Sequence, residues 1–248
     1  MTLVEHLDEL RTRIIVSAIV LVLAVAFCFW QNHTLLEIAN RPLPRDLDPL
    51  TFSPTEPFFT TVKLSIYGGV LIALPILLYQ IYAFVLPAFS PGEKRVMLPL
   101  LLMVPVLFIA GTVFGYYVVL PPALKFLLGF NVDQFNIEVR ANEYYGFFVL
   151  TLIGVGILFQ IPVGVLAVTR LGIVTPQQLA HNRRYAILII AVVAMLLPGT
   201  DPVTMLISMA PLYLLFELSV LLARVFSPSR EPDEDPEVGG GPPAPATG

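Results

Sequence analysis

The sequence predicts an all-α integral membrane protein with six transmembrane helices and both termini in the cytoplasm. The first observation is composition: of 248 residues, 56% are hydrophobic and 13% are charged, whereas soluble domains carry about 25% charged residues. The second is a series of apolar runs close to the ~20 residues that a helix needs to cross a bilayer. The third is an unequal distribution of Lys and Arg between the loops, which sets orientation.

Six apolar runs are the candidate spans, and they cover about 14–30, 62–86, 96–120, 144–171, 185–197 and 203–225. The fifth is short for an ordinary bilayer, and a run of 10–14 residues also fits a re-entrant segment. Five prolines inside the runs free backbone carbonyls and bend helices, which membranes tolerate where neighbouring groups satisfy the backbone; they are Pro75, Pro99, Pro105, Pro162 and Pro211. We therefore expect a curved array with a concave wall.

Orientation follows from the charges beside the runs. With both termini on one side, that side holds nine Lys and Arg residues and the other holds five. The richer side is cytoplasmic by the positive-inside rule. We expect residues 1–226 to form one membrane domain, and the acidic, Pro- and Gly-rich residues 227–248 to form a disordered cytoplasmic tail.

Two external loops are long enough to carry structure. The loop 31–61 is too rich in proline for a long helix, but a short helix is predicted to begin near Ser53 or Thr55, where hydroxyls precede Glu56 in the manner of a cap. The loop 122–143 has an apolar start that could lie on the membrane interface.

Catalysis is not expected. The three histidines, His6, His33 and His181, all fall outside the predicted hydrocarbon core, and the single cysteine is Cys28. The sequence contains neither a phosphate-binding loop nor a dinucleotide fingerprint, and it has no clustered metal-ligand pattern. We expect no cofactor, no metal and no nucleic-acid partner.

Acidic residues before the first span are the most informative feature. Glu5, Asp8 and Glu9 stand where Lys and Arg usually dominate, so they call for a cationic partner. One alternative is internal: Glu9 precedes Arg13 by four residues and could pair with it along a helix. Glu5 could likewise cap the start of that helix.

Glu93 lies in a second acidic loop at the same membrane face. Ser90, Pro91 and Glu93 also fit a helix start, and that role can coexist with binding. Together, Glu9 and Glu93 could each meet one guanidinium group in bidentate fashion, a geometry that lysine cannot copy. The prediction is a docking site for an arginine-bearing peptide.

Polar residues in or next to the later spans are further candidates. Gln160 lies midway along the fourth run and should face protein or a watery groove; the alternative is an interhelical hydrogen bond. Glu217, inside the sixth run, is either functional or a structural, protonated carboxyl. Asp201 is a candidate binding residue or a helix cap. Thr175 begins a predicted capping box, and Arg183 fits a positive-inside anchor.

The chain resembles the TatC family of the bacterial twin-arginine translocase. Six segments carry the resemblance in order, and they are 6–14 (HLDELRTRI), 57–69 (PFFTTVKLSIYGG), 78–95 (LYQIYAFVLPAFSPGEKR), 159–163 (FQIPV), 196–202 (LLPGTDP) and 211–220 (PLYLLFELSV). The match covers about 4–226, and the combination is highly specific although no single segment is.

The resemblance implies a six-span, glove-like receptor in the bacterial cytoplasmic (inner) membrane. It would bind twin-arginine signal peptides of folded cargo and work with TatA- and TatB-type single-span subunits near the fifth and sixth spans, in the lipid bilayer, as a homo-oligomeric complex driven by the proton motive force. The residues at matching positions are Glu9, Arg11, Glu93, Lys94 and Arg95 for the peptide, with Pro42 and Phe84 also important.

One position departs from the family pattern. The intramembrane polar residue of the fourth span is often Glu in TatC proteins, and here it is Gln160. A titrating carboxylate is thereby put in doubt at this position, while a hydrogen-bonding role remains.

Two rival functions were weighed. A small-molecule secondary transporter could use Glu217 as its coupling carboxylate, but no internal repeat of the kind that such transporters carry is visible. A purely structural scaffold is the other alternative.

Overall fold

The computed structural model describes residues 3–44, 47–85, 91–134, 137–170, 174–195 and 202–226. Within these ranges the regular elements are helices, and one isolated β-bridge joins Leu50 to Arg140. The helices are α1 (Leu3–Trp30), α2 (Asn32–Asn40), α3 (Glu56–Val85), α4 (Pro91–Phe114), the π-helix η2 (Gly115–Val119), α5 (Leu120–Gly129), α6 (Ala141–Leu158), α7 (Ile161–Arg170), α8 (Pro176–His181), α9 (Arg183–Met195) and α10 (Pro202–Phe226).

Four helical stretches are long and apolar enough to cross a membrane, and they are His6–Trp30, Glu56–Phe84, Leu101–Gly129 and Ala141–Thr169. They correspond to the first four predicted spans. The fifth and sixth predicted spans are helical as α9 and α10, with a shorter apolar stretch at Met209–Leu221. That these two also cross the bilayer stays a prediction.

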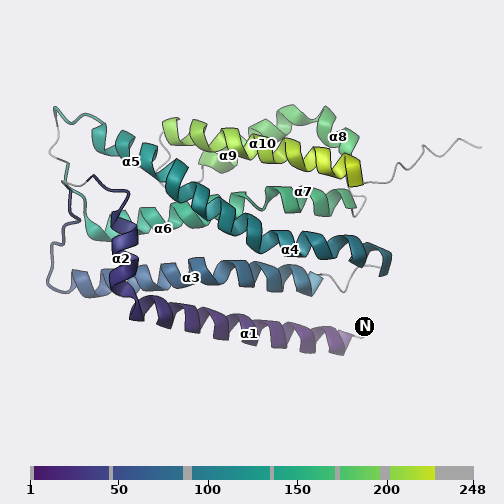
Figure 1. Ribbon diagram of the computed structural model, residues 1–248, viewed down its shortest axis with the longest axis horizontal. Helices are drawn as coiled ribbons and strands as arrows, with labels where there is room; N and C mark the ends of the chain where they lie inside the picture. Colours follow the sequence, from purple (N-terminus) through teal and green to yellow (C-terminus); the bar gives the residue numbers. More distant parts are fainter. Residues whose placement is uncertain are drawn as a thin grey trace, which may run out of the picture.

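The helices form a flattened array of roughly parallel and antiparallel rods (Figure 1). Helix α1 packs on α3, α3 packs on α4 and α6, and α7 and α10 continue the array with α9 beside α10. The start of α1 and the end of α10 lie at the same end of the molecule, where the purple and yellow ends of the ribbon are found (Figure 1). We call this the cytoplasmic end, following the predicted orientation.

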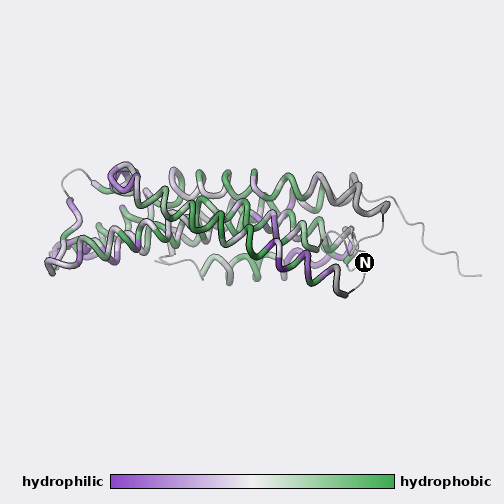
Figure 2. The backbone as a smooth tube through the Cα atoms, turned by 90° about the horizontal axis from the view of Figure 1, so that it is seen from below, coloured by the Kyte–Doolittle hydropathy of each residue, from purple (hydrophilic) through white to green (hydrophobic). Residues whose placement is uncertain are grey.

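Hydropathy along the array matches a membrane protein. Apolar residues fill the middle of the long helices, and hydrophilic residues gather towards the two ends (Figure 2). Many large apolar side chains in the long helices are exposed, among them Val22, Leu102 and Leu214. In a bilayer such side chains meet lipid, so their exposure has no cost there.

Glycines set the closest helix contacts. A Cβ on Gly69 would lie 2.6 Å from the backbone Cα of Val25, so α1 and α3 touch main chain to main chain. In the same way, a Cβ on Gly156 would lie 2.7 Å from the Phe108 ring, and one on Gly111 would lie 2.7 Å from Phe159. Small residues at these crossings are what membrane helices need to pack, because lipid offers no hydrophobic drive.

Two predicted spans differ from the sequence-based boundaries. The third does not end near 120 but continues through η2 and α5 to Gly129, so the start of the loop 122–143 is helical, and its position at the membrane interface stays a prediction. Pro121 and Pro122 lack the N–H groups that would bond to Tyr117 and Val118 in an α-helix. The turn widens instead, and the Leu120 N–H bonds to Gly115 O.

The fourth span is two helices and not one. Helix α6 ends at Leu158 and α7 begins at Ile161, with Phe159 and Gln160 in a turn between them. Pro162 has no N–H to donate to the Leu158 carbonyl, so the α-helical ladder stops there. The break places Gln160 in the turn between the two helices.

The external loop 31–61 contains a helix that was not predicted, α2. Three tyrosines from other helices hold its end: Tyr116 donates to Ile38 O at 3.0 Å, Tyr144 donates to Ala39 O, and Tyr145 donates to Asn40 Oδ1 at 2.9 Å. The partly buried Pro42 follows directly. The short helix predicted near Ser53 is the start of α3 itself, at Glu56.

The remainder of this loop is tied to the start of α6. Leu50 N donates to Val139 O at 2.8 Å and Ala141 N donates to Leu50 O at 2.9 Å. Arg140 Nε donates to Glu56 Oε1 at 2.8 Å, while Glu56 Oε2 accepts from Phe52 N at 2.7 Å. The Glu56 carboxylate raises the pKa of Arg140 above its ordinary value. The external end is therefore one ordered cap.

Candidate functional site

The acidic start of α1 forms a polar cluster with the last turns of α3. Arg13 donates through Nε and Nη2 to the same oxygen of Glu9, Oε1, at 3.0 and 2.6 Å. Its third nitrogen, Nη1, donates to Gln80 Oε1 of α3 at 2.9 Å. The pair predicted along the helix is thus present, and Gln80 extends it across to a second helix.

The second carboxylate oxygen of Glu9 has no partner. Oε2 is buried from solvent, and no hydrogen bond to it is formed within the described part of the chain. The Glu9 side chain as a whole is 21% exposed, so it lies close to the surface. A buried carboxylate oxygen without a donor costs free energy, and a cationic donor from outside would remove that cost.

An aromatic pair lies one helical turn nearer the cytoplasmic end. His6 and Phe84 stack with ring centroids 4.3 Å apart and planes 19° apart. His6 precedes Glu9 by three residues on α1, and Phe84 follows Gln80 by four on α3, so each shares a helix face with its polar neighbour. Phe84 is half-buried, while Arg11 is exposed on α1.

Glu93, Lys94 and Arg95 lie in the first turns of α4, which begins at the same end of the molecule as α1 (Figure 1). The positions of their side chains lie outside what the structure describes, as does Ser90, so the predicted capping role of Glu93 is not tested. The backbone places Glu9 and Glu93 at one face.

Gln160 is buried between helices at 8% exposure. Its Nε2 donates to Val104 O of α4 at 3.1 Å, which confirms the interhelical hydrogen bond weighed from the sequence. Its Oε1 is buried without a partner in the described chain, and so are the hydroxyl oxygens of Thr112 and Thr151. Each of these oxygens can accept a hydrogen bond from a water molecule or from another helix.

Glu217 is already paired. Its Oε2 accepts from Arg183 Nη2 of α9 at 3.0 Å, and its Oε1 accepts from Tyr213 at 2.8 Å. An anchoring role was the only one predicted for Arg183, because its partner lies 34 residues away and leaves no local pattern. This network ties α9 to α10 and favours the structural alternative for Glu217. Asp201 lies outside the described residues.

The predicted capping box at Thr175 is confirmed. Thr175 N donates to Gln178 Oε1 at 2.9 Å, and Gln178 N donates to Thr175 Oγ1 at 3.2 Å. Both bonds satisfy donors that a helix start leaves free. Thr175 therefore starts α8 and has no further role in the site.

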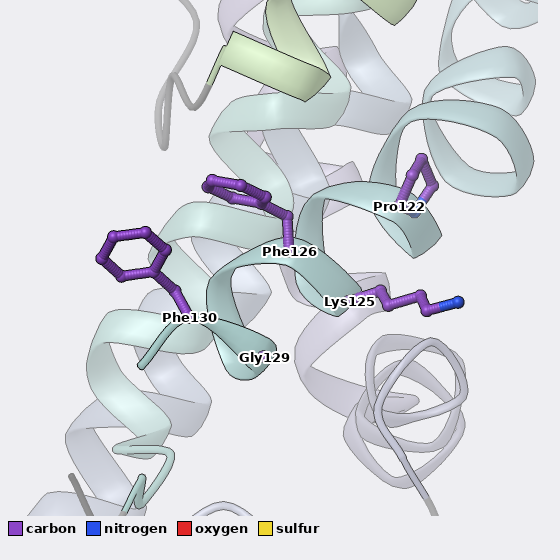
Figure 3. A pocket seen from close by; sticks show the side chains of 5 residues that line it. All are labelled: Pro122, Lys125, Phe126, Gly129 and Phe130. Atoms are coloured by element: carbon purple, nitrogen blue, oxygen red, sulfur yellow. The ribbon is translucent and has the colours of Figure 1, made fainter. Parts of the chain in front are cut away.

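One surface hollow was not indicated by the sequence. Pro122, Lys125, Phe126, Gly129 and Phe130 line it, all from α5 and the residue after it. The Phe126 and Phe130 rings lie to one side, and the Lys125 side chain extends the other way (Figure 3). A hollow built on a single helix, with its charge pointing away from its rings, is not a ligand-binding site.

These features define a class: a multi-pass helical membrane protein whose polar cluster of Glu9, Arg13 and Gln80 lies at the end of the array that we call cytoplasmic. Residues 5–211 match the model of the family described as Sec-independent protein translocase protein (TatC). The chain belongs to the TatC family, so it is a component of a protein translocase and not a catalytic enzyme.

Relatives and solved structures agree over nearly the whole chain. The Sec-independent protein translocase protein TatC of Aquifex aeolicus (strain VF5) is 36% identical over 230 residues, which is 91% of this chain and 95% of that protein. The protein of the same name from Koribacter versatilis (strain Ellin345) is 35% identical over 236 residues, 92% of this chain and 87% of that one. A crystal structure of the twin-arginine translocase receptor TatC in DDM superposes with a TM-score of 0.74 at 36% identity, covering 88% of this chain and 99% of that one.

Proposed function

We propose that this protein is the receptor subunit that binds twin-arginine signal peptides of folded cargo at its cytoplasmic end. The observation that carries the proposal is the Glu9 carboxylate, which lies at that end with one oxygen, Oε2, buried and without a hydrogen-bond donor among the described residues. A signal-peptide guanidinium supplies such a donor with a charge of the right sign.

Glu9 and Glu93 would bind the two signal arginines in different ways. Glu9 was expected to grip a guanidinium with both oxygens, but Arg13 already occupies Oε1. One signal arginine therefore meets Glu9 through Oε2 alone, sharing the carboxylate with Arg13. The second signal arginine meets Glu93, which α4 presents at the same end of the molecule.

Neighbouring residues complete the proposed peptide site. Phe84, stacked on His6, offers an apolar surface to the hydrophobic segment that follows the arginines. Arg11 is exposed one turn from the start of the first span, and Lys94 and Arg95 follow Glu93 directly. These cations repel a peptide whose positive charges do not line up with the two carboxylates, so they restrict binding to peptides with the correct charge order.

Assembly with TatA- and TatB-type single-span subunits is proposed for the other edge of the array. There, α9 and α10 expose apolar side chains, including Leu188, Ile189 and Leu214. Gln160, with its unpartnered Oε1, offers a hydrogen bond to the signal peptide or to a partner helix. The same proposal includes six membrane-spanning helices and a homo-oligomeric receptor complex. It also includes transport driven by the proton motive force.

The test is crosslinking from a signal peptide that carries a photoreactive residue beside its two arginines. We expect Glu9→Ala and Glu93→Ala each to abolish the crosslink while the protein still inserts and purifies. Glu37→Ala is the matched control, because Glu37 pairs with Arg41 on an exposed face of the external helix α2. Normal crosslinking by both cytoplasmic variants would show that the assigned site is wrong.

A further inference from the structure

Gln80 is a polar residue of α3 that the sequence did not single out, and its side chain accepts a hydrogen bond from Arg13. Its Oε1 accepts from Arg13 Nη1 at 2.9 Å across the α1–α3 contact. The other two nitrogens of the same guanidinium both bind Glu9 Oε1. All three nitrogens of Arg13 are therefore in use.

The arrangement of this ion pair is unusual in one respect. An arginine four residues after a glutamate can form a bidentate pair, with Nε on one carboxylate oxygen and Nη2 on the other. Here both nitrogens converge on Oε1, and Oε2 stays without a donor although it is buried. A small rotation of the guanidinium would satisfy Oε2, but it would pull Nη1 from Gln80.

We propose that Gln80 is a positioning residue that keeps the Arg13–Glu9 pair on one carboxylate oxygen and so reserves Oε2 of Glu9 for an arginine of the incoming signal peptide. This inference rests on the proposed function and adds the device that keeps the receptor site open. Without Gln80, Arg13 closes over both oxygens of Glu9 and competes with the peptide for them.

The device also accounts for the choice of residues. Arginine at position 13 has the planar fork needed to serve Glu9 and Gln80 at once, which the single ammonium of lysine cannot do. A glutamine at position 80 supplies a neutral acceptor, so it holds Arg13 without attracting the signal arginines to itself. The His6–Phe84 stack, one turn nearer the cytoplasm on the same two helices, lies where the peptide would enter.

The experiment measures binding of a fluorescently labelled twin-arginine signal peptide to the full chain in lipid nanodiscs. We expect Gln80→Leu to weaken binding roughly tenfold, while Arg13→Gln binds as tightly as the unmodified protein or more tightly. In the double variant, Gln80→Leu should cost less than roughly twofold, because the competing guanidinium is gone. Tyr79→Phe, the neighbouring position on α3, is the matched control and should bind normally.

The outcomes separate the positioning role from a structural role and from the proposed function. An unchanged Kd for Gln80→Leu, or an equal loss with and without Arg13, would overturn the role of Gln80, since a merely structural residue would cost the same in both backgrounds. Glu9→Gln is run in parallel. If it binds the peptide normally, the proposed function itself fails; if it does not bind while Gln80→Leu does, only the present inference fails.

Discussion

At the scale of single residues, the two carboxylates that sequence patterns singled out in α1 and α10 differ in what they leave unsatisfied. Both oxygens of Glu217 accept hydrogen bonds, from Arg183 and Tyr213. In Glu9, Oε1 accepts from Arg13, whereas Oε2 has no hydrogen-bond donor in the described part of the chain. A carboxylate whose two oxygens already accept hydrogen bonds gains little from a further donor. A buried oxygen without a donor is stabilised by any donor that reaches it. This difference is why the proposed binding site includes Glu9 and not Glu217.

This residue-scale geometry predicts a strong preference for arginine over lysine in the signal peptide. Replacing both signal arginines by lysines should weaken binding roughly tenfold, about 1.4 kcal/mol, because lysine provides a point charge without a planar fork. Titration of labelled peptides into the protein in nanodiscs gives both dissociation constants. Raising ionic strength should weaken both peptides, since the site lies near the surface and its charges are screened. Equal affinity of the two peptides would contradict the site.

At the scale of elements, glycines decide where helices can meet. Gly69 brings α3 against the backbone of α1, and this contact positions Gln80 opposite Arg13 eleven residues further along α3. At the other end of the molecule, three tyrosines fix the end of α2, so the external cap is held by side-chain hydrogen bonds to main-chain and amide oxygens. The α1–α3 contact and the hydrogen bonds at the end of α2 therefore hold the helices together, and the proposed binding site lies at the opposite, cytoplasmic ends of these helices.

The α1–α3 contact gives a prediction for stability. Gly69→Ala places a Cβ 2.5 to 2.7 Å from atoms of Val25, two of them backbone atoms that cannot move away cheaply. We expect a loss of about 1–3 kcal/mol, seen as a lower thermal unfolding temperature in detergent, together with weaker binding of the signal peptide.

Gly164→Ala is the matched control for that variant. A Cβ at Gly164 in α7 meets nothing within 4 Å, and alanine favours a helix over glycine by up to about 1 kcal/mol. This variant should be as stable as the unmodified protein or more so. Equal destabilisation by both variants would mean that the effect of Gly69 is not a matter of helix contact.

At the scale of the whole molecule, the array has two chemically different ends. Helix α2, the loop to Glu56 and the start of α6 form the external cap, and the start of α1 with the ends of α3 and α10 form the cytoplasmic end (Figure 1). The apolar middle between them matches a membrane (Figure 2). The proposed receptor function requires the binding site to lie at one of these ends, because cargo approaches from one side of the membrane only.

The whole-molecule topology is tested by labelling single cysteines in intact cells, in a Cys28→Ala background. An impermeant maleimide should label Asn131→Cys, after α5, and Gly199→Cys, between the last two predicted spans, but not Gln177→Cys in α8. Permeabilised cells should label all three. If Gly199→Cys were protected in intact cells, α9 and α10 would not cross the membrane as a pair, and the six-span proposal would fail.

Short-range sequence patterns were enough to predict several features of the fold and of the candidate site. The Thr175 capping box and the Glu9–Arg13 pair depend on residues three or four apart, so spacing along one helix reveals them. The four long spans follow from apolar length. A bend at Pro162 was predicted, but the full break at Phe159 and the π-turn before α5 were not, because a proline shows that a hydrogen bond is lost but not how the helix responds.

The sequence by itself determined that the chain is a helical membrane protein of the TatC family and that carboxylates precede its first apolar run. Only the tertiary structure decided which carboxylate keeps an oxygen without a hydrogen-bond donor in the described part of the chain. Gln80 lies 67 residues from Arg13, and Arg183 lies 34 residues from Glu217. Hydrogen bonds between helices depend on how the helices cross, and that is fixed by packing at glycines and prolines rather than by any local pattern.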